Sequence, residues 1–344
     1  LQGLSVFPAN HPLHTGMSFG PSSVPAAENA FRNCDCMLAI GTRFGEIATG
    51  SFGVKVTDNL IHIDINPRVF HANYPAKVAL EGDAAQVLEL VWDAMQKLPE
   101  PVNERNNIRE QILKDKEAYT QVWLQHDSGD RVNPLHFFRS LRKALDDEDF
   151  VVVDDGNHTF LTAELMPIHR SKHMISPTDF NCMGYAVPAV IGTKLANPDK
   201  QVVGIIGDGA FTMTCMEILT ATNLKLGSVF FVFHDGELSQ ISQAQEIPYN
   251  RKTCTVLNGL DVSGVARATG ARFLALERNI DCDDVVTKAL QMARDNVPVI
   301  VDVKIDYSKR TRFTEGIVGT NLKRFNLGTK ARFIGRALIR RVTG

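Results

Sequence analysis

Two aspartates, each beside a glycine, follow apolar runs of the sequence and are its strongest candidates for chemistry. Asp208 lies in the segment GDGA (207–210) after the run VVGII, and Asp235 lies in the segment HDG (234–236) after SVFFVF. Glycines let a backbone approach a phosphate closely, and a helix N-terminus directs amide N–H groups at an anion. Mg²⁺ binds carboxylates together with phosphates. The residues therefore predict a site for a diphosphate and Mg²⁺.

The spacing of the two aspartates has a geometric explanation. Asp235 follows Asp208 by 27 residues. One helix of about four turns, a tight turn and a strand of about six residues would return the chain to the same edge of a parallel sheet. Both acids would then lie at the carboxyl ends of parallel strands, where ligands bind in open α/β sheets. We expect the two carboxylates to converge on one cation.

The apolar runs that must position these acids alternate with segments of helical periodicity, among them 84–98 and 211–225. Continuous runs of Val, Ile and Phe are typical of strands that helices cover on both faces of a parallel sheet. The expected strands are 36–40, 60–65, 150–153, 202–206, 228–233, 271–276 and 298–303. The sequence therefore predicts an α/β protein with two doubly wound parallel-sheet domains.

Changes in composition mark the expected domain boundaries. Residues 1–98 read as a central Rossmann-like domain that is incomplete at its start, because residues 1–22 supply no first strand-helix unit. The polar and charged residues 99–131 read as a linker that is partly helical. Residues 132–306 form the domain with both aspartates, and residues 307–344 form a basic tail.

The composition excludes several classes of protein. The chain has 344 residues with 44% hydrophobic and 22% charged residues, which excludes disorder as its main state. No run approaches the roughly 18 to 20 apolar residues of a membrane helix. Six cysteines without a CxxC pair indicate neither a disulfide scaffold nor a zinc site, and the N-terminus lacks a signal-peptide pattern. We expect a soluble, cytoplasmic protein.

The segment around Asp208 resembles the signature of thiamin-diphosphate-dependent enzymes. The match comprises Ile191-Gly192, Pro198 and the run VGIIGDGA (203–210), together with the spacing to Asp235. The resemblance is closest to the acetohydroxyacid (acetolactate) synthase group. Three further segments resemble its central domain: FPANHPL (7–13), GTRF (41–44) and DINP (64–67). The resemblance implies thiamin diphosphate and Mg²⁺ as cofactors, and decarboxylation of a 2-oxo acid or cleavage of a related C–C bond, followed by transfer to an acceptor.

By this resemblance, three residues would hold the metal: Asp208, Asp235 and the main-chain carbonyl of Glu237. The family has an Asn-Asn pair where this chain has His234-Asp235. Aspartate keeps the oxygen ligand and adds a negative charge near the diphosphate, which Mg²⁺ must offset.

Other residues would hold and orient the cofactor. The carbonyl of Asn181 would accept the 4′-amino group, and Met183 would wedge the two rings into a bent shape that sets this group beside the reactive carbon of the thiazolium ring. The protein supplies orientation, whereas the cofactor supplies the carbanion chemistry. The remaining cofactor-binding residues implied by the resemblance are Gly156, Asn157, His158, Gly207, Gly209, Ala210 and Leu238.

The resemblance also implies partners. The family's catalytic glutamate is carried on an N-terminal domain that precedes the central domain, so we expect this chain to be the C-terminal part of a longer enzyme, or a subunit whose partner supplies that domain. The cofactor lies between two subunits in the family, which implies a homodimer or homotetramer. An alternative is a non-catalytic or regulatory relative that binds a diphosphate or nucleotide, since the His234-Asp235 variation and the absent glutamate domain fit it too.

FAD binding and substrate choice stay open. Gly41-Thr42-Arg43 and Asp64 follow expected strands, where relatives bind FAD, but no complete GxGxxG is present and an ordinary turn is favoured. The synthases carry a tryptophan nine residues after the metal-binding Asn, and that position is Ala244 here. A missing aromatic side chain enlarges the acceptor pocket, so the usual 2-oxobutyrate preference cannot be assumed.

The tail carries most of the chain's positive charge. Residues 307–344 hold ten Lys or Arg and one acid, Glu315, so their net charge is +9 and that of the rest is −11. This asymmetry argues against nucleic acid as a partner. Residues 329–342 predict an amphipathic helix that docks on the acidic body; a lid over the site, or peripheral contact with anionic lipid, are the alternatives. Its apolar stripe is Ala331, Ile334, Leu338 and Val342, and its basic stripe is Arg332, Arg336 and Arg340.

Overall fold

The structure, a computed structural model, describes residues 3–20, 22–32, 34–50, 52–99, 107–178, 180–315 and 325–343. The described residues form two compact units. The smaller unit comprises residues 15–119 and 312–324, and the larger comprises residues 1–14, 120–311 and 325–344. The N-terminal segment joins the larger unit in part because the N–H of Ala9 donates to the carbonyl of Ile168.

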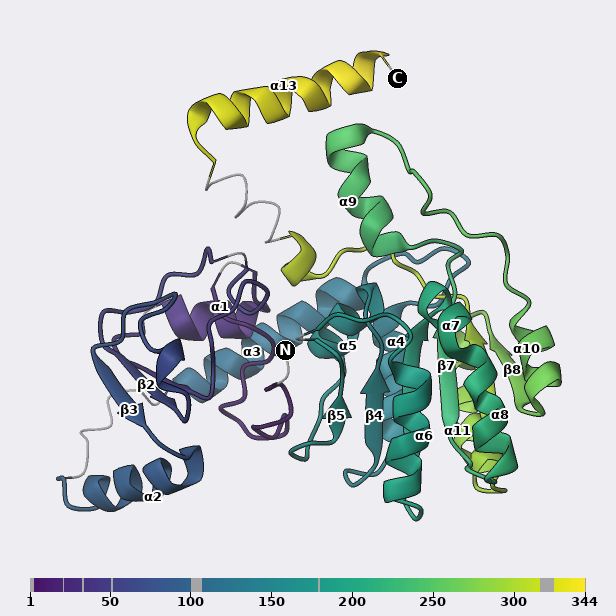
Figure 1. The fold of residues 1–344 in the computed structure, drawn as a ribbon, viewed down its shortest axis with the longest axis horizontal. Coiled ribbons are helices and arrows are strands. Elements are labelled where there is room, and N and C mark those ends of the chain that lie inside the picture. The colour runs from purple at the N-terminus through teal and green to yellow at the C-terminus, as the bar shows by residue number, and fades with distance from the viewer. Residues whose placement is uncertain are drawn as a thin grey trace. The chain divides into compact units, whose positions relative to one another are not determined.

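The larger unit is built on a six-stranded sheet with the order β5-β4-β6-β7-β9-β8 (Figure 1). All neighbouring strands are parallel. The strands are β4 (Phe150–Val153), β5 (Met174–Ile175), β6 (Val202–Gly207), β7 (Val229–Phe233), β8 (Arg272–Leu276) and β9 (Val299–Val303). Parallel strands need crossover connections, and helices supply them here.

Helices cover both faces of this sheet. The helices around the sheet are α4 (Pro134–Ala144), α5 (Asn157–Leu165), α6 (Ala186–Ala196), α7 (Asp208–Thr214), α8 (Ile218–Asn223), α10 (Val262–Thr269) and α11 (Cys282–Ala293), with 3₁₀ turns η2 (Cys215–Glu217) and η3 (Asn279–Asp281). Helices α9 (Ser239–Tyr249) and α13 (Leu327–Thr343) lie beyond the end of the strands and contact each other (Figure 1). Phe230 and Val232 of β7 join a core with α6, α8 and α10. The alternate side chains Phe231 and Phe233 stack edge-on against Phe137 of α4. A strand covered on both sides has no polar face, which explains its continuous apolar sequence.

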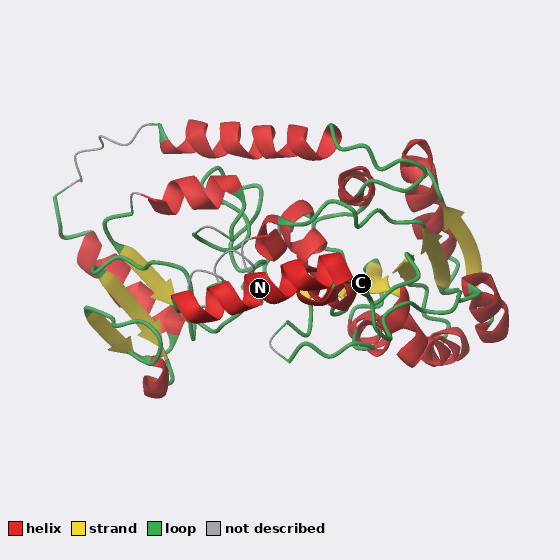
Figure 2. Cartoon of the chain, turned by 90° about the horizontal axis from the view of Figure 1, so that it is seen from above, coloured by secondary structure: helices red, strands yellow, loops and turns green. Residues whose placement is uncertain are grey.

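The smaller unit contains a parallel three-stranded sheet with the order β1-β2-β3. Its strands are β1 (Met37–Ile40), β2 (Leu60–Asp64) and β3 (Val78–Glu81), and its helices include α1 (Pro25–Arg32), η1 (Pro67–Val69) and α2 (Ala84–Met95). Met37, Ala39, Phe44 and Leu60 form a buried cluster. Helix α3 (Ile108–Leu124) connects the two units in sequence. Helices border the strands of each unit (Figure 2).

The predicted α/β class with two parallel sheets is confirmed. Each strand expected from an apolar run is present within a residue of its predicted bounds, whereas β3 and β5 have no strong apolar run and were missed. The helix expected at 211–225 instead begins at Asp208 and is interrupted by η2. A carboxylate in the first turn of a helix is favourable, so the helix starts at the aspartate despite its neighbouring glycine. In the described residues, no helix is both long and apolar enough to cross a bilayer.

We expect Gly227→Ala to destabilise the larger unit. Gly227 lies in the turn between α8 and β7, where an added Cβ would fall 1.7 Å from the carbonyl oxygen of Ala293 in α11. Overpacking against a rigid backbone should lower the free energy of unfolding by about 3 kcal/mol, measurable by urea denaturation.

The matched control is Gly192→Ala in α6, where an added Cβ has no neighbour within 4 Å. Alanine is the better helix former, so this variant should gain about 1 kcal/mol. Equal stabilities of the two variants would contradict the steric argument.

Candidate active site

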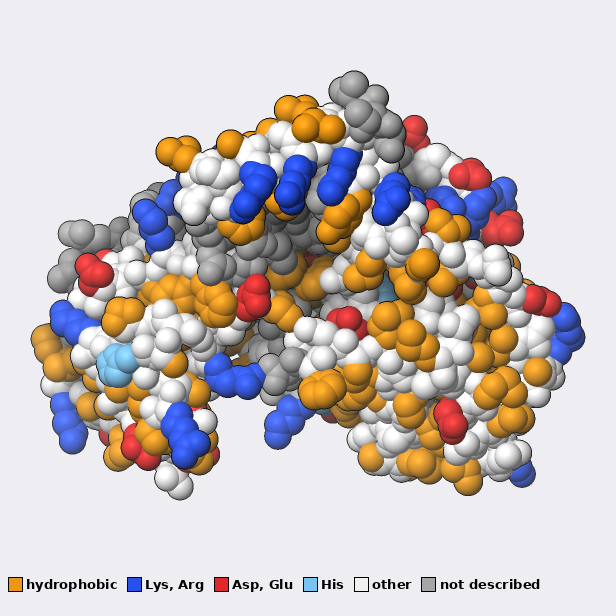
Figure 3. All heavy atoms as spheres, turned by 45° about the horizontal axis from the view of Figure 1, so that its top comes forward, with side chains coloured by type: hydrophobic (Ala, Val, Ile, Leu, Met, Phe, Trp, Pro, Cys, Tyr) orange, Lys and Arg blue, Asp and Glu red, His pale blue; other side chains and the backbone are white. Residues whose placement is uncertain are grey.

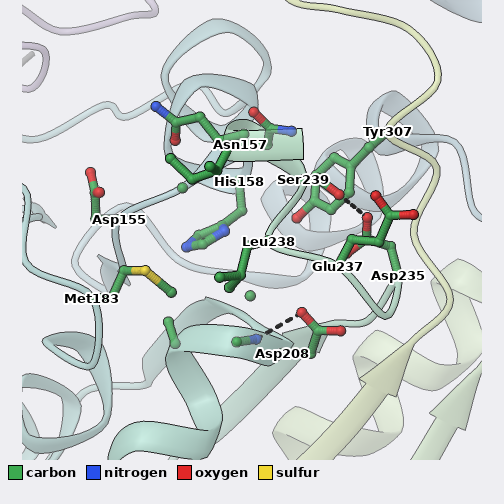
Figure 4. A pocket seen from close by; sticks show the side chains of 16 residues that line it. Asp155, Asn157, His158, Met183, Asp208, Asp235, Glu237, Leu238, Ser239 and Tyr307 are labelled. Atoms are coloured by element: carbon green, nitrogen blue, oxygen red, sulfur yellow. Dashed lines mark hydrogen bonds between the residues drawn. The ribbon is translucent and has the colours of Figure 1, made fainter. Parts of the chain in front are cut away.

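A pocket opens where β4, β6 and β7 end. These strands are neighbours in the sheet, so the loops that follow them meet at one edge (Figure 4). The pocket is lined by Asp155, Gly156, Asn157, His158, Met183, Gly207, Asp208, Gly209, Ala210, Asp235, Glu237, Leu238, Ser239, Gln240, Ile241 and Tyr307. The expected convergence of Asp208 and Asp235 at one edge of a parallel sheet is therefore observed.

Asp208 connects the ends of β6 and β7. Its Oδ1 accepts the N–H of Gly209 at 2.7 Å, and its Oδ2 accepts the N–H of Gly236 at 2.8 Å. The side chain is buried, and burial raises the pKa of the carboxyl above its ordinary value although these hydrogen bonds oppose the shift. One carboxylate thus holds two strand ends at a fixed separation.

The half-buried Asp235 contributes the second carboxylate. It accepts a hydrogen bond from the hydroxyl of Ser239, in the first turn of α9. Burial, together with the charge of Asp208, raises the pKa of Asp235 to about 6. Two carboxylates that both resist ionisation form a site that an added cation would stabilise.

The histidine that precedes Asp235 is held between two acids. His234 Nδ1 donates to Asp302 of β9 at 3.0 Å, and its Nε2 lies 3.9 Å from Asp208 Oδ2. The hydrogen bond with Asp302 raises the pKa of His234. His234 is not among the residues that line the pocket, so it acts on the site through Asp208.

Glu237 forms an ion pair at the rim of the pocket. Both of its carboxylate oxygens accept from Lys252 Nζ at 2.7 Å. Its side chain is therefore already paired, and its main-chain carbonyl is the group that the sequence resemblance implies as a metal ligand. Within the residues that the structure describes, no three His, Cys, Asp or Glu side chains cluster as a metal centre.

His158 packs against a cradle of glycines. An added Cβ would lie 2.7 Å from its Cε1 at Gly156 and 3.0 Å from it at Gly207. The imidazole is 3% exposed, and its Nε2 has no hydrogen-bond partner within the described parts of the chain. Burial lowers the pKa of His158 to about 3, so the ring is neutral near pH 7. A buried polar atom without a partner, beside backbone with no side chains, is suited to meet a ligand.

Asp154, at the end of β4, fixes the loop that carries Met183. Its two carboxylate oxygens accept the N–H groups of Gly184 at 2.9 Å and Ala186 at 2.7 Å. Asp154 is completely buried. The loop therefore cannot move independently of β4, and Met183 is held against the pocket from the side opposite Leu238 (Figure 4).

Tyr307 enters the pocket from a distant part of the sequence. Its side chain lies beside Asp235 and Glu237 (Figure 4), and its hydroxyl is buried without a hydrogen-bond partner in the described residues. Burial, with the charges of Asp235 and Asp208, raises the pKa of Tyr307 well above its ordinary value. The phenol therefore stays protonated and can donate to an anion.

Eleven of the twelve site residues predicted from the sequence line this pocket; their roles toward a cofactor stay predictions. The exception is Asn181, which is exposed and whose N–H donates to the carbonyl of Pro177 in a tight turn. The pocket residues that the sequence did not indicate are Asp155, Ser239, Gln240, Ile241 and Tyr307. The first four adjoin predicted residues in sequence. Tyr307 had no local signal, because only the sheet topology brings it there.

The strand ends of the smaller unit have local structural roles. Asp64 Oδ1 accepts the N–H of Asn66 at 2.8 Å, which stabilises the turn after β2. The carbonyl of Thr42 accepts from Nε2 of the buried His62 at 2.8 Å. Thr42 and Asp64 therefore have structural roles in the turns after β1 and β2, and these hydrogen bonds do not indicate a binding site for FAD.

Two family models match this chain. Residues 1–91 match "Thiamine pyrophosphate enzyme, central domain", and residues 154–303 match "Thiamine pyrophosphate enzyme, C-terminal TPP binding domain". Thiamine pyrophosphate is another name for thiamin diphosphate. The second match begins at Asp154 and ends with β9, so it spans most of the pocket described above.

Individual relatives resemble the chain over most of its length. The acetolactate synthase isozyme 3 large subunit of Escherichia coli is 27% identical over 316 residues, which cover 90% of this chain and 54% of the relative. The acetolactate synthase large subunit of Corynebacterium glutamicum is 29% identical over 315 residues, which cover 88% of this chain and 49% of the relative. A probable acetolactate synthase large subunit of Methanocaldococcus jannaschii is 28% identical. The chain spans about half the length of the curated relatives it matches.

Protonation of His158 should contribute to acid destabilisation. Its pKa is about 3 in the folded protein and near 6.5 when unfolded, so the unfolded state binds the extra proton first as the pH falls. The stability associated with the neutral ring is complete above pH 6.5 and is lost progressively towards pH 3.

The replacement His158→Gln should therefore reduce the loss of stability between pH 6.5 and 4, measured by urea denaturation at each pH. The matched control is His136→Gln, a histidine of α4 outside the pocket. A stability profile of His158→Gln that parallels that of the unchanged chain would contradict the assignment.

Proposed function

Because the chain belongs to the thiamine pyrophosphate enzymes, we propose that its pocket binds thiamin diphosphate with Mg²⁺ and that the complete enzyme decarboxylates a 2-oxo acid and transfers the product to an acceptor. The observation that carries this proposal is the convergence of the buried Asp208 and the half-buried Asp235 in one pocket at the carboxyl edge of the sheet, together with the Tyr307 hydroxyl, a donor without a partner in the described residues. A diphosphate and a divalent cation would satisfy both this hydroxyl and the two acids.

The diphosphate end of the cofactor would lie between the glycines and the metal. The residues Gly156, Gly207 and Gly209 leave backbone accessible because an added Cβ at each would meet a pocket side chain. The first N–H groups of α5 would meet a phosphate oxygen, and the neutral ring of His158 would lie beside it.

The metal would be held by oxygen atoms at the ends of β6 and β7. The carboxylates of Asp208 and Asp235 and the main-chain carbonyl of Glu237 are the protein ligands, and diphosphate oxygens would complete the coordination. His234 then has a positioning role, since its bond to Asp302 orients it beside Asp208. The hydrogen bond with Asp302 raises the pKa of His234, which favours the protonated ring beside the extra negative charge that aspartate brings where the family has asparagine.

The organic end of the cofactor would contact apolar side chains. Met183 and Leu238 face one another across the pocket (Figure 4), and Leu238 is held by its N–H, which donates to the carbonyl of Thr255 at 2.7 Å. When bound, thiamin diphosphate supplies a carbon nucleophile that cleaves the bond beside a carbonyl group. The two side chains orient its rings and exclude water.

The substrate and the assembly are parts of the same proposal. The named relatives are acetolactate synthases, which favours a 2-oxo acid as substrate. The proposal includes a second subunit and a glutamate-bearing domain that complete the site in the full enzyme. Gln240 and Ile241, in the first turn of α9, are the pocket residues from this chain that would lie nearest the substrate's entry to the cofactor.

The replacement Asp208→Asn should abolish Mg²⁺-dependent binding of thiamin diphosphate. It removes the negative charge of one metal ligand and replaces one of its two carboxylate oxygens by an NH₂ group, which cannot bind a cation, so affinity should fall about 100-fold in isothermal titration calorimetry. The matched control Asp284→Asn, exposed in α11, should bind as the unchanged chain does.

Binding that is indifferent to Mg²⁺ and to Asp208→Asn would refute the assignment of the site. Carbon dioxide release from pyruvate by the full-length enzyme tests the reaction separately. Mg²⁺-dependent binding without turnover of any 2-oxo acid would favour the non-catalytic alternative.

The replacement Tyr307→Phe should separate stability from binding. Removing a buried hydroxyl that lacks a partner should raise the free energy of unfolding of the ligand-free chain by about 1 kcal/mol. If this hydroxyl donates to the cofactor's diphosphate, the same variant should bind thiamin diphosphate about tenfold more weakly. Weaker stability with unchanged binding would show that the hydroxyl serves the fold alone.

A further inference from the structure

Helix α13 is amphipathic and exposes its apolar side chains. Its sequence, LGTKARFIGRALIRRVT, contains five Lys or Arg and no acid. Leu327 is 85% exposed, Ile334 51% and Leu338 57%. Large apolar side chains on successive turns of one helix are rarely left in water unless they contact something else. This surface takes no part in the pocket described above.

The helical spacing groups these residues on one side. At 3.6 residues per turn, Leu327, Ala331, Ile334 and Leu338 form a stripe, which we call the apolar stripe. Lys330 and Arg341 lie along one edge of it, and Arg332, Arg336 and Arg340 lie on the opposite face of the helix. Figure 3 shows Lys and Arg side chains in a row along this helix, with hydrophobic side chains beside them.

The other side of α13 contacts the larger unit. Arg340 lies over the ring of Tyr249 at the end of α9, 5.0 Å from its centroid. Ala337 is half-buried. Helices α9 and α13 lie next to each other (Figure 1). The helix is therefore attached through one face while the apolar stripe points away from that attachment.

The positive charge extends from α13 onto the neighbouring surface. A polar cavity of about 540 Å³ is lined by Glu246, Asn250, Arg251, Lys252, Arg310 and Arg341. Four of these six side chains are cationic and one is acidic. The surface around this end of α13 therefore attracts anions over an area larger than the helix.

We propose that α13 binds the surface of a bilayer containing anionic lipids. The helix lies parallel to the membrane plane, its apolar stripe enters the boundary of the acyl chains, and Lys330 and Arg341 at the edge of the stripe meet lipid phosphates. The Lys and Arg side chains of α13 and its neighbouring surface are complementary in charge to anionic lipid headgroups, which favours a bilayer as the partner. The described residues contain no membrane-spanning helix, so the contact is peripheral.

The same charges argue against a second copy of this chain as the occupant. Two α13 helices paired through their apolar stripes would place basic side chains opposite basic side chains, whereas stable helix pairs carry opposite charges at these edges. The acidic body is not the occupant either, since the helix is already attached to it through the opposite face and the stripe is still exposed.

Vesicle co-sedimentation of the full chain tests this proposal. At about 0.1 M salt we expect binding to phosphatidylcholine vesicles with 30% phosphatidylserine to be roughly tenfold or more stronger than to pure phosphatidylcholine vesicles. The double variant Ile334→Asp with Leu338→Asp should lower the binding to anionic vesicles roughly tenfold or more. Its control is Ile280→Asp, which places the same charge on another exposed residue, 80% exposed in η3.

A second pair of variants tests the charges. Lys330→Ser with Arg341→Ser should weaken binding to anionic vesicles roughly tenfold, whereas Arg267→Ser, at an exposed residue of α10, should leave it unchanged. Circular dichroism verifies that each variant folds. Equal binding to neutral and anionic vesicles, or full binding by the Ile334→Asp, Leu338→Asp variant, overturns the proposal. The proposal is also overturned if the unchanged chain binds no vesicles and forms an oligomer that the Ile334→Asp, Leu338→Asp variant does not form, measured by analytical ultracentrifugation.

Discussion

The parallel arrangement of β4, β6 and β7 is the constraint on which the site depends. Because all three strands run the same way and are neighbours, their carboxyl ends and the helices that follow meet at one edge of the sheet. Asp208 then joins two of these ends through the N–H groups of Gly209 and Gly236. Asp154 joins the third to the loop of Met183. Side-chain hydrogen bonds at the ends of the strands thus fix the backbone segments that form the pocket.

The electrostatics of the pocket indicate a site made for a ligand. The buried Asp208 and the half-buried Asp235 lie near one another, while His158 Nε2 and the Tyr307 hydroxyl are buried without partners in the described residues. Each of these groups destabilises the ligand-free chain, because a buried polar group loses its hydration. Diphosphate oxygens can accept hydrogen bonds from the unpartnered donors, and a divalent cation can bind the carboxylates. A diphosphate with its cation would therefore offset the desolvation cost of both kinds of group.

Stability and binding are served by different residues in the larger unit. The core between the sheet and its helices consists of side chains such as Phe230, Val232 and Phe231, which lie within the sheet rather than at its edge. The pocket residues follow the ends of the strands. Helix α13 contributes neither to the central core nor to the pocket, and the proposed contact with a bilayer would account for its exposed apolar stripe.

The sequence by itself determined the α/β class and the strands with continuous apolar runs, because strand period is a local property of the chain. The glycine flanks and the spacing of Asp208 and Asp235 indicated the edge of the sheet where the pocket lies, and the family resemblance implied the other predicted residues that line it. The sequence missed Tyr307 because this residue follows β9, and only the order of the strands in the sheet brings the end of β9 beside the end of β7. It did not indicate that Asn181 would face solvent or that His158 would be unpartnered. Those outcomes depend on which groups pack together, and packing is decided only by the tertiary structure.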